Sequence, residues 1–333
     1  MRSFLKRYRR ALLHPISFVV IGICIGVIVY VVGIHILGGS CFTRSFPHIN
    51  PMFGCKTPVV NQRGYVELKS ALQTFIADEV KTGKISSLSV YFRDLQNGPT
   101  LGIDEHEKFA PASLLKLPLL LTYLELAENH PSLLATRLEY DHYDEPLTQS
   151  IAPEKSILPG TPYSIDEMLS YMIRYSDNRA YYVLREYLRQ ISPDEDLLKN
   201  TYIALGIVDP KNDLDQTIEV KQYSSIFIQL YNASFFDNKE TSERALALLM
   251  ETTFDKGLVA GVPAGLPVAH KFGERVGFAG NLQQLHDCGI VYFPKSPYLL
   301  CVMTRGTDRN ELSHAIKQIS TMVYTEVGSR RLR

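Results

Sequence analysis

The chain has 333 residues, of which 45% are hydrophobic, so it can bury a large core without support from metal ions or disulfides. Its formal net charge is zero, but residues 1–60 contain Lys and Arg and no Asp or Glu, which leaves the remainder mildly acidic. That balance excludes an extended nucleic-acid groove, because such a groove needs a dense Lys and Arg surface.

The first predicted element is a transmembrane helix over residues 15–37. No residue from Ile16 to Leu37 carries a formal charge, and at about 1.5 Å per residue this run spans roughly 33 Å, the thickness of a bilayer. Residues 1–14 are basic, so the positive-inside rule predicts a cytoplasmic N-terminus and a single-pass cell-membrane protein with an extracytoplasmic body. A cleaved signal peptide is the alternative, but its apolar core is normally only ~7–15 residues long.

Residues 38–60 show no periodicity and are predicted to be a linker, and the folded domain is predicted over residues 61–333. The five cysteines show no metal-binding spacing, and no cofactor motif is present, so neither a metal nor a cofactor is predicted. Cys288 and Cys301 lie in apolar strand-like segments, where we expect free thiols that pack as small core side chains. Only Cys41 and Cys55 are candidates for a disulfide.

The pattern of apolar residues in the body predicts strands near both ends of the sequence and helices between them. The predicted elements are a helix over 66–80, strands over 87–95 and 99–103, mostly helix over 113–248, strands over 268–274, 287–293 and 298–304, and a helix over 311–327. This order predicts an α/β (α+β) fold with one sheet flanked by the terminal helices, and a separate helical lobe. A cleft between the two parts is the expected ligand site.

Three short motifs carry candidate chemistry. Ser113 and Lys116 lie one helical turn apart, so a nucleophile and a base would share one helix face. The second motif is Ser176-Asp177-Asn178 between two helical patterns, where helix capping is the plain structural interpretation. The third motif is Lys271-Phe272-Gly273 in an apolar strand, and its structural alternative is a surface lysine before a tight turn.

Taken together, these motifs and their surroundings resemble those of class A β-lactamases and penicillin-binding serine hydrolases. The resemblance covers about 61–327 and includes Pro118 after the first motif and the stretch from Met172 to Ala180 around the second. It implies a β-lactamase/transpeptidase-like fold with an antiparallel sheet and an acyl-enzyme mechanism.

The resemblance also implies a role for each motif residue. Ser113 would be the acylated nucleophile and Lys116 its base, while Ser176 would pass a proton to the leaving nitrogen. Asn178 would bind the substrate's side-chain amide, and Lys271 would attract the substrate carboxylate. The glycine of the third motif, Gly273, would let the substrate approach the strand, and the backbone N–H groups of Ser113 and Glu274 would form the oxyanion hole.

Two departures from the family pattern bear on the substrate and on turnover. Phe272 occupies a position where the family usually has a hydroxyl that contacts the substrate carboxylate. The family's deacylating glutamate has no counterpart in residues 206–215, which offer only Asp209, Asp213 and Asp215.

The sequence therefore predicts a membrane-anchored serine hydrolase acting on a β-lactam or a cell-wall peptide amide. A penicillin-binding D,D-peptidase with slow β-lactam turnover is one alternative. The other is a non-catalytic, membrane-tethered binding domain that has kept the fold.

Overall fold

The computed structural model describes residues 46–50, 64–96, 98–141, 149–207, 217–278 and 281–331, together with Ile23. Every helix and strand named below belongs to one compact unit, formed by residues 46–50 and 58–333. Apart from Ile23, the predicted cytoplasmic segment and membrane span lie outside the described residues. None of the helices within the described ranges combines the length and the hydropathy needed to cross a bilayer.

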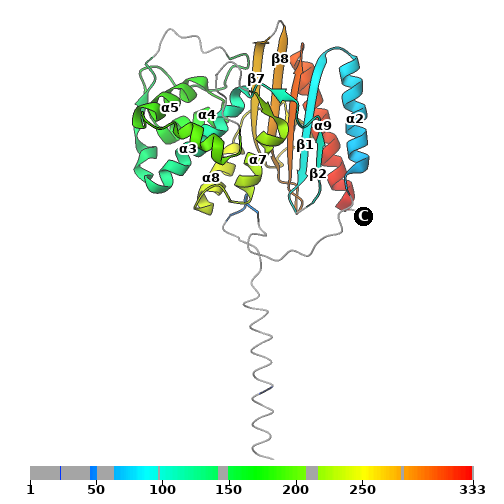
Figure 1. Ribbon diagram of the computed structural model, residues 1–333, viewed down its shortest axis with the longest axis horizontal. Helices are drawn as coiled ribbons and strands as arrows, with labels where there is room; N and C mark the ends of the chain where they lie inside the picture. The colour runs from blue at the N-terminus through cyan, green and yellow to red at the C-terminus, as the bar shows by residue number, and fades with distance from the viewer. Residues whose placement is uncertain are drawn as a thin grey trace, which may run out of the picture. The chain divides into compact units, whose positions relative to one another are not determined.

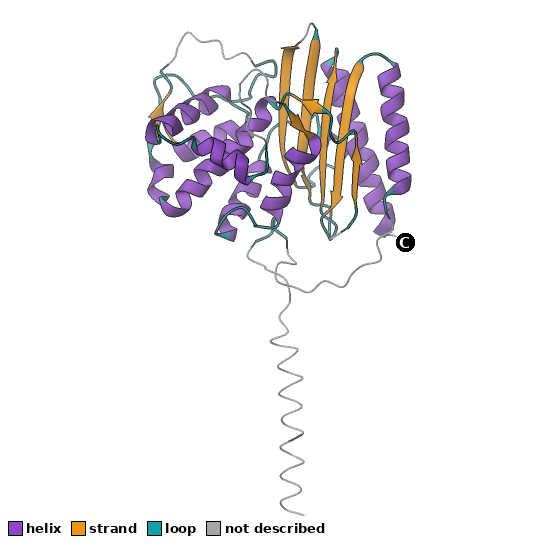
Figure 2. Ribbon diagram, viewed as in Figure 1, coloured by secondary structure: helices purple, strands orange, loops and turns teal. Residues whose placement is uncertain are grey.

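A five-stranded antiparallel sheet forms the centre of this unit (Figure 2). Its order is β2-β1-β9-β8-β7, so strands from both ends of the sequence are neighbours and β7 forms one edge. The strands are β1 (Ile85–Asp94), β2 (Thr100–Ile103), β7 (Val268–Phe278), β8 (Leu282–Val291) and β9 (Tyr298–Gly306). The predicted sheet with strands from both chain ends is confirmed.

Helices cover both faces of the sheet (Figure 1). The terminal helices α2 and α9 lie side by side on one face, and α7 packs on the other, next to the helical lobe. The helices are α2 (Val66–Lys81), α3 (Lys116–Asn129), α4 (Ile165–Arg174), α5 (Asn178–Ile191), α6 (Leu197–Ala204), α7 (Val220–Tyr231), α8 (Lys239–Leu249) and α9 (Arg309–Arg331), with short 3₁₀ turns η1 (Ala112–Leu115), η2 (Pro131–Ala135) and η3 (Leu258–Gly261). Two small antiparallel pairs, which were not predicted, are β3 (Lys108–Phe109) with β6 (Ile218–Glu219), and β4 (Arg137–Glu139) with β5 (Pro162–Ser164).

The sheet separates two hydrophobic cores. Successive side chains of a strand point to opposite faces, so Phe92 and Val302 pack in the core under α2 and α9, while Tyr91 and Met303 pack in the core of the helical lobe. The central strands are therefore buried on both faces, which explains why β9 is an almost continuous apolar run.

Cys288 on β8 and Cys301 on β9 are directly opposite each other and are joined by a disulfide. Both side chains are fully buried in the core of the helical lobe. The prediction of two free thiols is wrong, because it used only the position of each cysteine along its strand. The strand register, which the apolar pattern does not reveal, brings the two Cα atoms within 3.9 Å. Cys41 and Cys55 lie outside the described residues.

Part of the predicted linker packs on the folded body. The backbone N–H groups of His48 and Ile49 donate to the Glu243 carboxylate, at 2.9 and 3.2 Å, and Asn50 N donates to Tyr231 O at 2.6 Å. Ile49 is 1% exposed and joins the core of the helical lobe. Residues 46–50 are therefore held by specific contacts.

Candidate active site

Ser113 lies at the start of a helix, as its motif predicts. It belongs to η1, which continues directly into α3 at Lys116. Ala112 has a φ of 49°, so the chain enters this turn through a left-handed conformation that is unfavourable for alanine. Such strain persists only where the surroundings enforce it, and it is frequent next to functional groups.

The third motif lies against this turn. A Cβ atom at Gly273 would come within 2.8 Å of Pro111 O and 2.9 Å of Leu114 Cγ. Only glycine therefore lets β7 approach η1 so closely, which is a structural reason for Gly273 beside any role toward a substrate.

The amine of Lys116 connects the first two motifs. Its Nζ atom lies 3.0 Å from Ser113 Oγ, 3.1 Å from Ser176 Oγ, 2.5 Å from Ser176 O and 2.6 Å from Asn178 Oδ1. The two shorter contacts involve oxygens that can only accept hydrogen bonds, and the two longer ones involve hydroxyls that can also donate. A neutral amine can therefore donate to Ser176 O and Asn178 Oδ1 and direct its lone pair toward the Ser113 hydroxyl.

Burial favours this neutral form of Lys116. Only 2% of the residue is exposed, and desolvation lowers the pKa of its amine to about 7, although the charges of Asp177 and Glu274 oppose the shift. A lysine with this pKa exchanges protons readily near neutral pH, as a general base must.

The second motif combines capping with a place in the site. Asp177 caps α5, since its carboxylate accepts from Arg179 N at 3.0 Å, and it also accepts from Ser156 Oγ and Ile157 N, both at 2.9 Å. Ser176 has a φ of 55°, and its hydroxyl lies near Lys116. The capping interpretation therefore applies to Asp177, whereas Ser176 and Asn178 point toward the first motif.

Lys271 is fully buried, so the interpretation of a surface lysine is wrong. Its ammonium donates to Ser176 Oγ at 3.0 Å and to Phe272 O at 2.9 Å. Burial lowers the pKa of Lys271 well below its usual value, and the neighbouring charge of Lys116 lowers it further.

Phe272 replaces the family's hydroxyl with an aromatic contact. The Lys271 nitrogen lies 4.2 Å from the centre of the Phe272 ring, within cation–π range. The same ring stacks on Phe254, with 4.2 Å between the ring centres. Phe272 is only 4% exposed and belongs to the core under α2 and α9.

The side chain of Glu274 binds a segment without any recognised motif. Its Oε1 accepts from Ser150 N at 2.9 Å and from Ile151 N at 3.0 Å. The preceding residue, Gln149, donates to Ser176 O at 3.0 Å. Sequence analysis missed residues 149–151 because these contacts use backbone groups and one amide, which leave no signature in the sequence.

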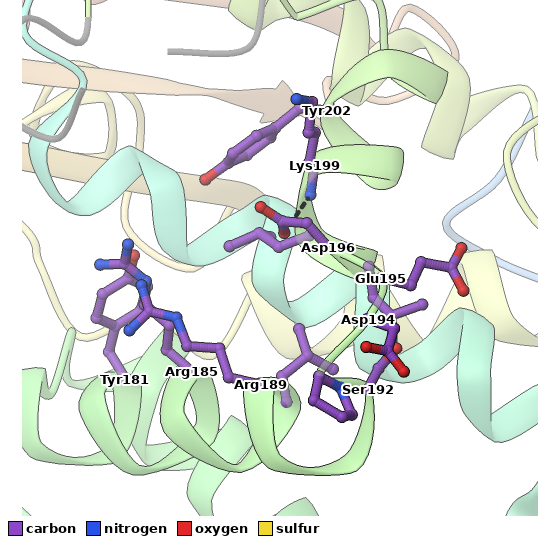
Figure 3. Close-up of a pocket in the computed structure, with 13 residues that line it drawn as sticks. Tyr181, Arg185, Arg189, Ser192, Asp194, Glu195, Asp196, Lys199 and Tyr202 are labelled. Carbon is purple, nitrogen blue, oxygen red and sulfur yellow. Dashed lines mark hydrogen bonds between the residues drawn. The ribbon is translucent and has the colours of Figure 1, made fainter. Parts of the chain in front are cut away.

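A pocket of about 360 Å³ contains the predicted nucleophile. Its lining includes Ser113, Lys116 and Asn178 of the first two motifs and Glu274, which follows the third motif. Ser176 and Lys271 do not line this pocket, and they join the site through their contacts with the Lys116 amine and with each other. A second pocket, of about 430 Å³, continues along α5 and shares Tyr181 and Arg185 with the first. Figure 3 shows this second pocket, with Arg185 and Arg189 on α5 and acidic residues 194–196 across from them.

Two histidines near the third motif contact different groups. His270 Nδ1 lies 2.8 Å from an Asp287 oxygen, whereas His286 Nε2 donates to Ala110 O at 3.0 Å. Burial lowers the pKa of His286 to about 4, so its ring is neutral near pH 7 and holds the segment before Ser113. No group of three or more metal-binding side chains occurs within the described ranges. The aspartates 209, 213 and 215 lie outside those ranges.

The sequence and the fold of the chain are similar to those of known proteins. The profile of the Beta-lactamase enzyme family matches residues 67–327. The chain is 27% identical over 267 residues to a beta-lactamase of Bacillus subtilis (strain 168), covering 74% of this chain and 83% of that protein. Among solved structures, a class A beta-lactamase from Mycobacterium abscessus is similar, with a TM-score of 0.64 and 23% identity over 77% of this chain and 99% of that one. The structure of PBP-A is also similar, with a TM-score of 0.65 and 21% identity over 82% and 100% of the two chains.

Proposed function

The chain belongs to the beta-lactamase enzyme family, and it is a serine hydrolase of the β-lactamase type. We propose that Ser113 is acylated by β-lactams or related amides and that water then hydrolyses the acyl-enzyme. We further propose that the enzyme is membrane-anchored through residues 15–37, with its catalytic body outside the cytoplasm. The buried Cys288–Cys301 disulfide supports that location, because disulfides persist mainly in oxidising compartments.

The observation that carries the proposal is the position of the Lys116 amine. One nitrogen lies within 3.1 Å of both Ser113 Oγ and Ser176 Oγ, so a proton has a short path from the nucleophile to the second serine. Acyl transfer from an amide to a serine needs one hydroxyl to attack the amide carbon and a proton donor for the departing nitrogen, and the two serines supply these groups.

The proposed acylation step follows from this geometry. Ser113 Oγ forms a bond to the amide carbon and gives its proton to neutral Lys116. The carbon–nitrogen bond then breaks, and Ser176 protonates the leaving nitrogen while it recovers a proton from Lys116. Backbone N–H groups of Ser113 and Glu274 are the proposed donors to the oxyanion, and Asn178 is the proposed contact for the acyl half of the substrate.

A penicillin-binding D,D-peptidase is a second candidate, because residues 206–215 contain no glutamate to activate the deacylating water. A chain that acylates well and deacylates slowly behaves as a penicillin-binding protein. One solved structure with this fold is a PBP-A L158E mutant in an acyl-enzyme complex with penicillin G.

Steady-state hydrolysis of penicillin G by the full chain and by Ser113→Ala tests the proposed function. Turnover that depends on Ser113 supports a β-lactamase, and stoichiometric labelling with slow turnover supports the peptidase. Equal behaviour of the two chains would refute the role of Ser113 in both.

A further inference from the structure

A third pocket, of about 420 Å³, lies beside the second and third motifs. Its floor is formed by the buried side chains of Tyr175, Phe254, Phe272 and Leu285. Its walls are residues 150–154, then Thr253, Asp255 and Lys256, and the start of α9 with Arg309, Asn310 and Ser313. We call it the amine-side pocket, and the pocket that contains Ser113 the nucleophile pocket.

The amine-side pocket adjoins the proposed proton relay. Tyr175 in its floor directly precedes Ser176, and Phe272 directly follows Lys271. The Ser176 hydroxyl and the Lys271 ammonium are 3.0 Å apart, so the two motifs that border the pocket meet at the relay.

A contact joins the linings of the two pockets. Glu274 lines the nucleophile pocket, while Ser150 and Ile151, whose N–H groups bind its carboxylate, line the amine-side pocket. The two pockets are therefore neighbours, on either side of this contact.

Hydrogen bonds fix both walls of the amine-side pocket. Arg309 Nη1 donates to Ser150 O at 3.0 Å and to Ser150 Oγ at 3.1 Å. On the opposite wall, Thr253 N donates to Arg174 O at 2.9 Å, and Ser313 Oγ donates to Lys256 O at 2.6 Å. Walls held in this way form a pocket before any ligand binds, which is typical of small-molecule sites.

The lining indicates what kind of group the pocket accepts. The lining has two basic residues, Lys256 and Arg309, and two acidic residues, Glu154 and Asp255. Their formal charges cancel, so the lining favours neither a cationic nor an anionic ligand. The floor, in contrast, is aromatic and aliphatic, and the stacked rings of Phe254 and Phe272 form part of it.

We propose that the amine-side pocket binds the leaving half of the substrate and selects amides whose amine half carries an aromatic or large apolar side chain. This proposal rests on the proposed function, because it assigns the pocket next to Ser176 to the half of the substrate that contains the leaving nitrogen. That nitrogen receives its proton from Ser176. The proposal also gives Phe272 a role toward substrate in place of the missing hydroxyl.

Matched peptides test the selection. N-acetylalanyl-phenylalanine and N-acetylalanyl-glycine, in every configuration of their chiral centres, are assayed with the full chain in nanodiscs. We expect kcat/KM for the most reactive stereoisomer of the phenylalanine peptide to exceed kcat/KM for the more reactive glycine peptide by at least about tenfold. Burial of an aromatic side chain contributes that much discrimination or more.

Two variants fill the amine-side pocket from exposed positions, Ala152→Trp and Asn310→Trp, and should reduce the preference to below about threefold. Ser192→Trp is the matched control, because it adds the same indole to the pocket along α5 and should leave the preference unchanged. Thermal unfolding of each variant shows whether it remains folded.

Binding to the Ser113→Ala chain separates this inference from the proposed function. Phenylalaninamide should bind at least about tenfold more tightly than glycinamide, and Ala152→Trp should remove the difference. If neither peptide nor penicillin acylates Ser113, the proposed function fails and the leaving-half assignment fails with it. If acylation occurs without a preference, or if the preference persists in both filling variants, only the pocket assignment is wrong.

Discussion

Lys116 and Lys271 share one hydroxyl, because Ser176 Oγ lies 3.1 Å from the first lysine nitrogen and 3.0 Å from the second. Both lysines are buried, and two ammonium groups around one oxygen repel each other in a site with little water. This repulsion disfavours the state in which both lysines are protonated, so the charge of the pair changes with pH.

Acylation should therefore depend on pH through Lys116. Its amine has a pKa of about 7, and the neutral form is the base, so the acylation rate should rise as pH increases through about 7 and then level off. Lys116→Met should lower the rate by roughly 10²- to 10⁴-fold at neutral pH. A rate that increases steadily to about pH 10, or that is unaffected by Lys116→Met, would remove Lys116 from the role of base.

Replacement of the two neighbours Ser176 and Asp177 should separate chemistry from stability. Ser176→Ala should change the free energy of unfolding by less than about 1 kcal/mol while slowing acylation roughly 10²-fold or more. Asp177→Ala removes the α5 cap and the acceptor for Ser156 and Ile157, so it should lower the free energy of unfolding by about 2–4 kcal/mol. Urea unfolding with acylation assays would measure both, and the reverse ranking of the two variants would contradict the assignment.

The Cys288–Cys301 disulfide should be detectable as one cross-linked peptide pair in a non-reducing digest. Its loss in Cys288→Ala/Cys301→Ala should lower the free energy of unfolding by about 3 kcal/mol, since the bond closes a loop with a sequence separation of 13. Free thiols at both positions in protein isolated without reductant would show that the bond does not form.

The proposed topology predicts which end of the chain a protease can reach. Five basic residues precede the uncharged run, so a C-terminal tag should be cleaved on spheroplasts while an N-terminal tag is protected. Lysed cells provide the control, in which both tags should be cleaved. Cleavage of only the N-terminal tag on intact spheroplasts would reverse the orientation.

The sequence predicts elements well where one local signal dominates. The helix predicted over 66–80 is observed as α2 over 66–81, and the strand predicted over 87–95 is observed as β1 over 85–94. The structure brings the motif residues together as expected, because the motifs and their order in the sequence resemble those of a known family with this site.

Contacts that depend on register or on tertiary packing could not be predicted in this way. The pairing of Cys288 with Cys301 depends on which residues of β8 and β9 are opposite each other. The stack of Phe272 on Phe254 joins a strand to a loop without a motif. Binding of Glu274 to residues 150 and 151 uses backbone N–H groups, which every residue except proline has.

The central claim is that Ser113 forms an acyl-enzyme, and the intact mass of the full chain after mixing with penicillin G tests it most directly. We predict rapid addition of one penicillin to each chain, none to Ser113→Ala, and slow loss of the adduct, since no glutamate in 206–215 can activate water. Asp209→Asn, Asp213→Asn and Asp215→Asn would show whether an aspartate supplies the remaining deacylation. An adduct that forms equally on Ser113→Ala, or no adduct on either chain at any time, would contradict the account.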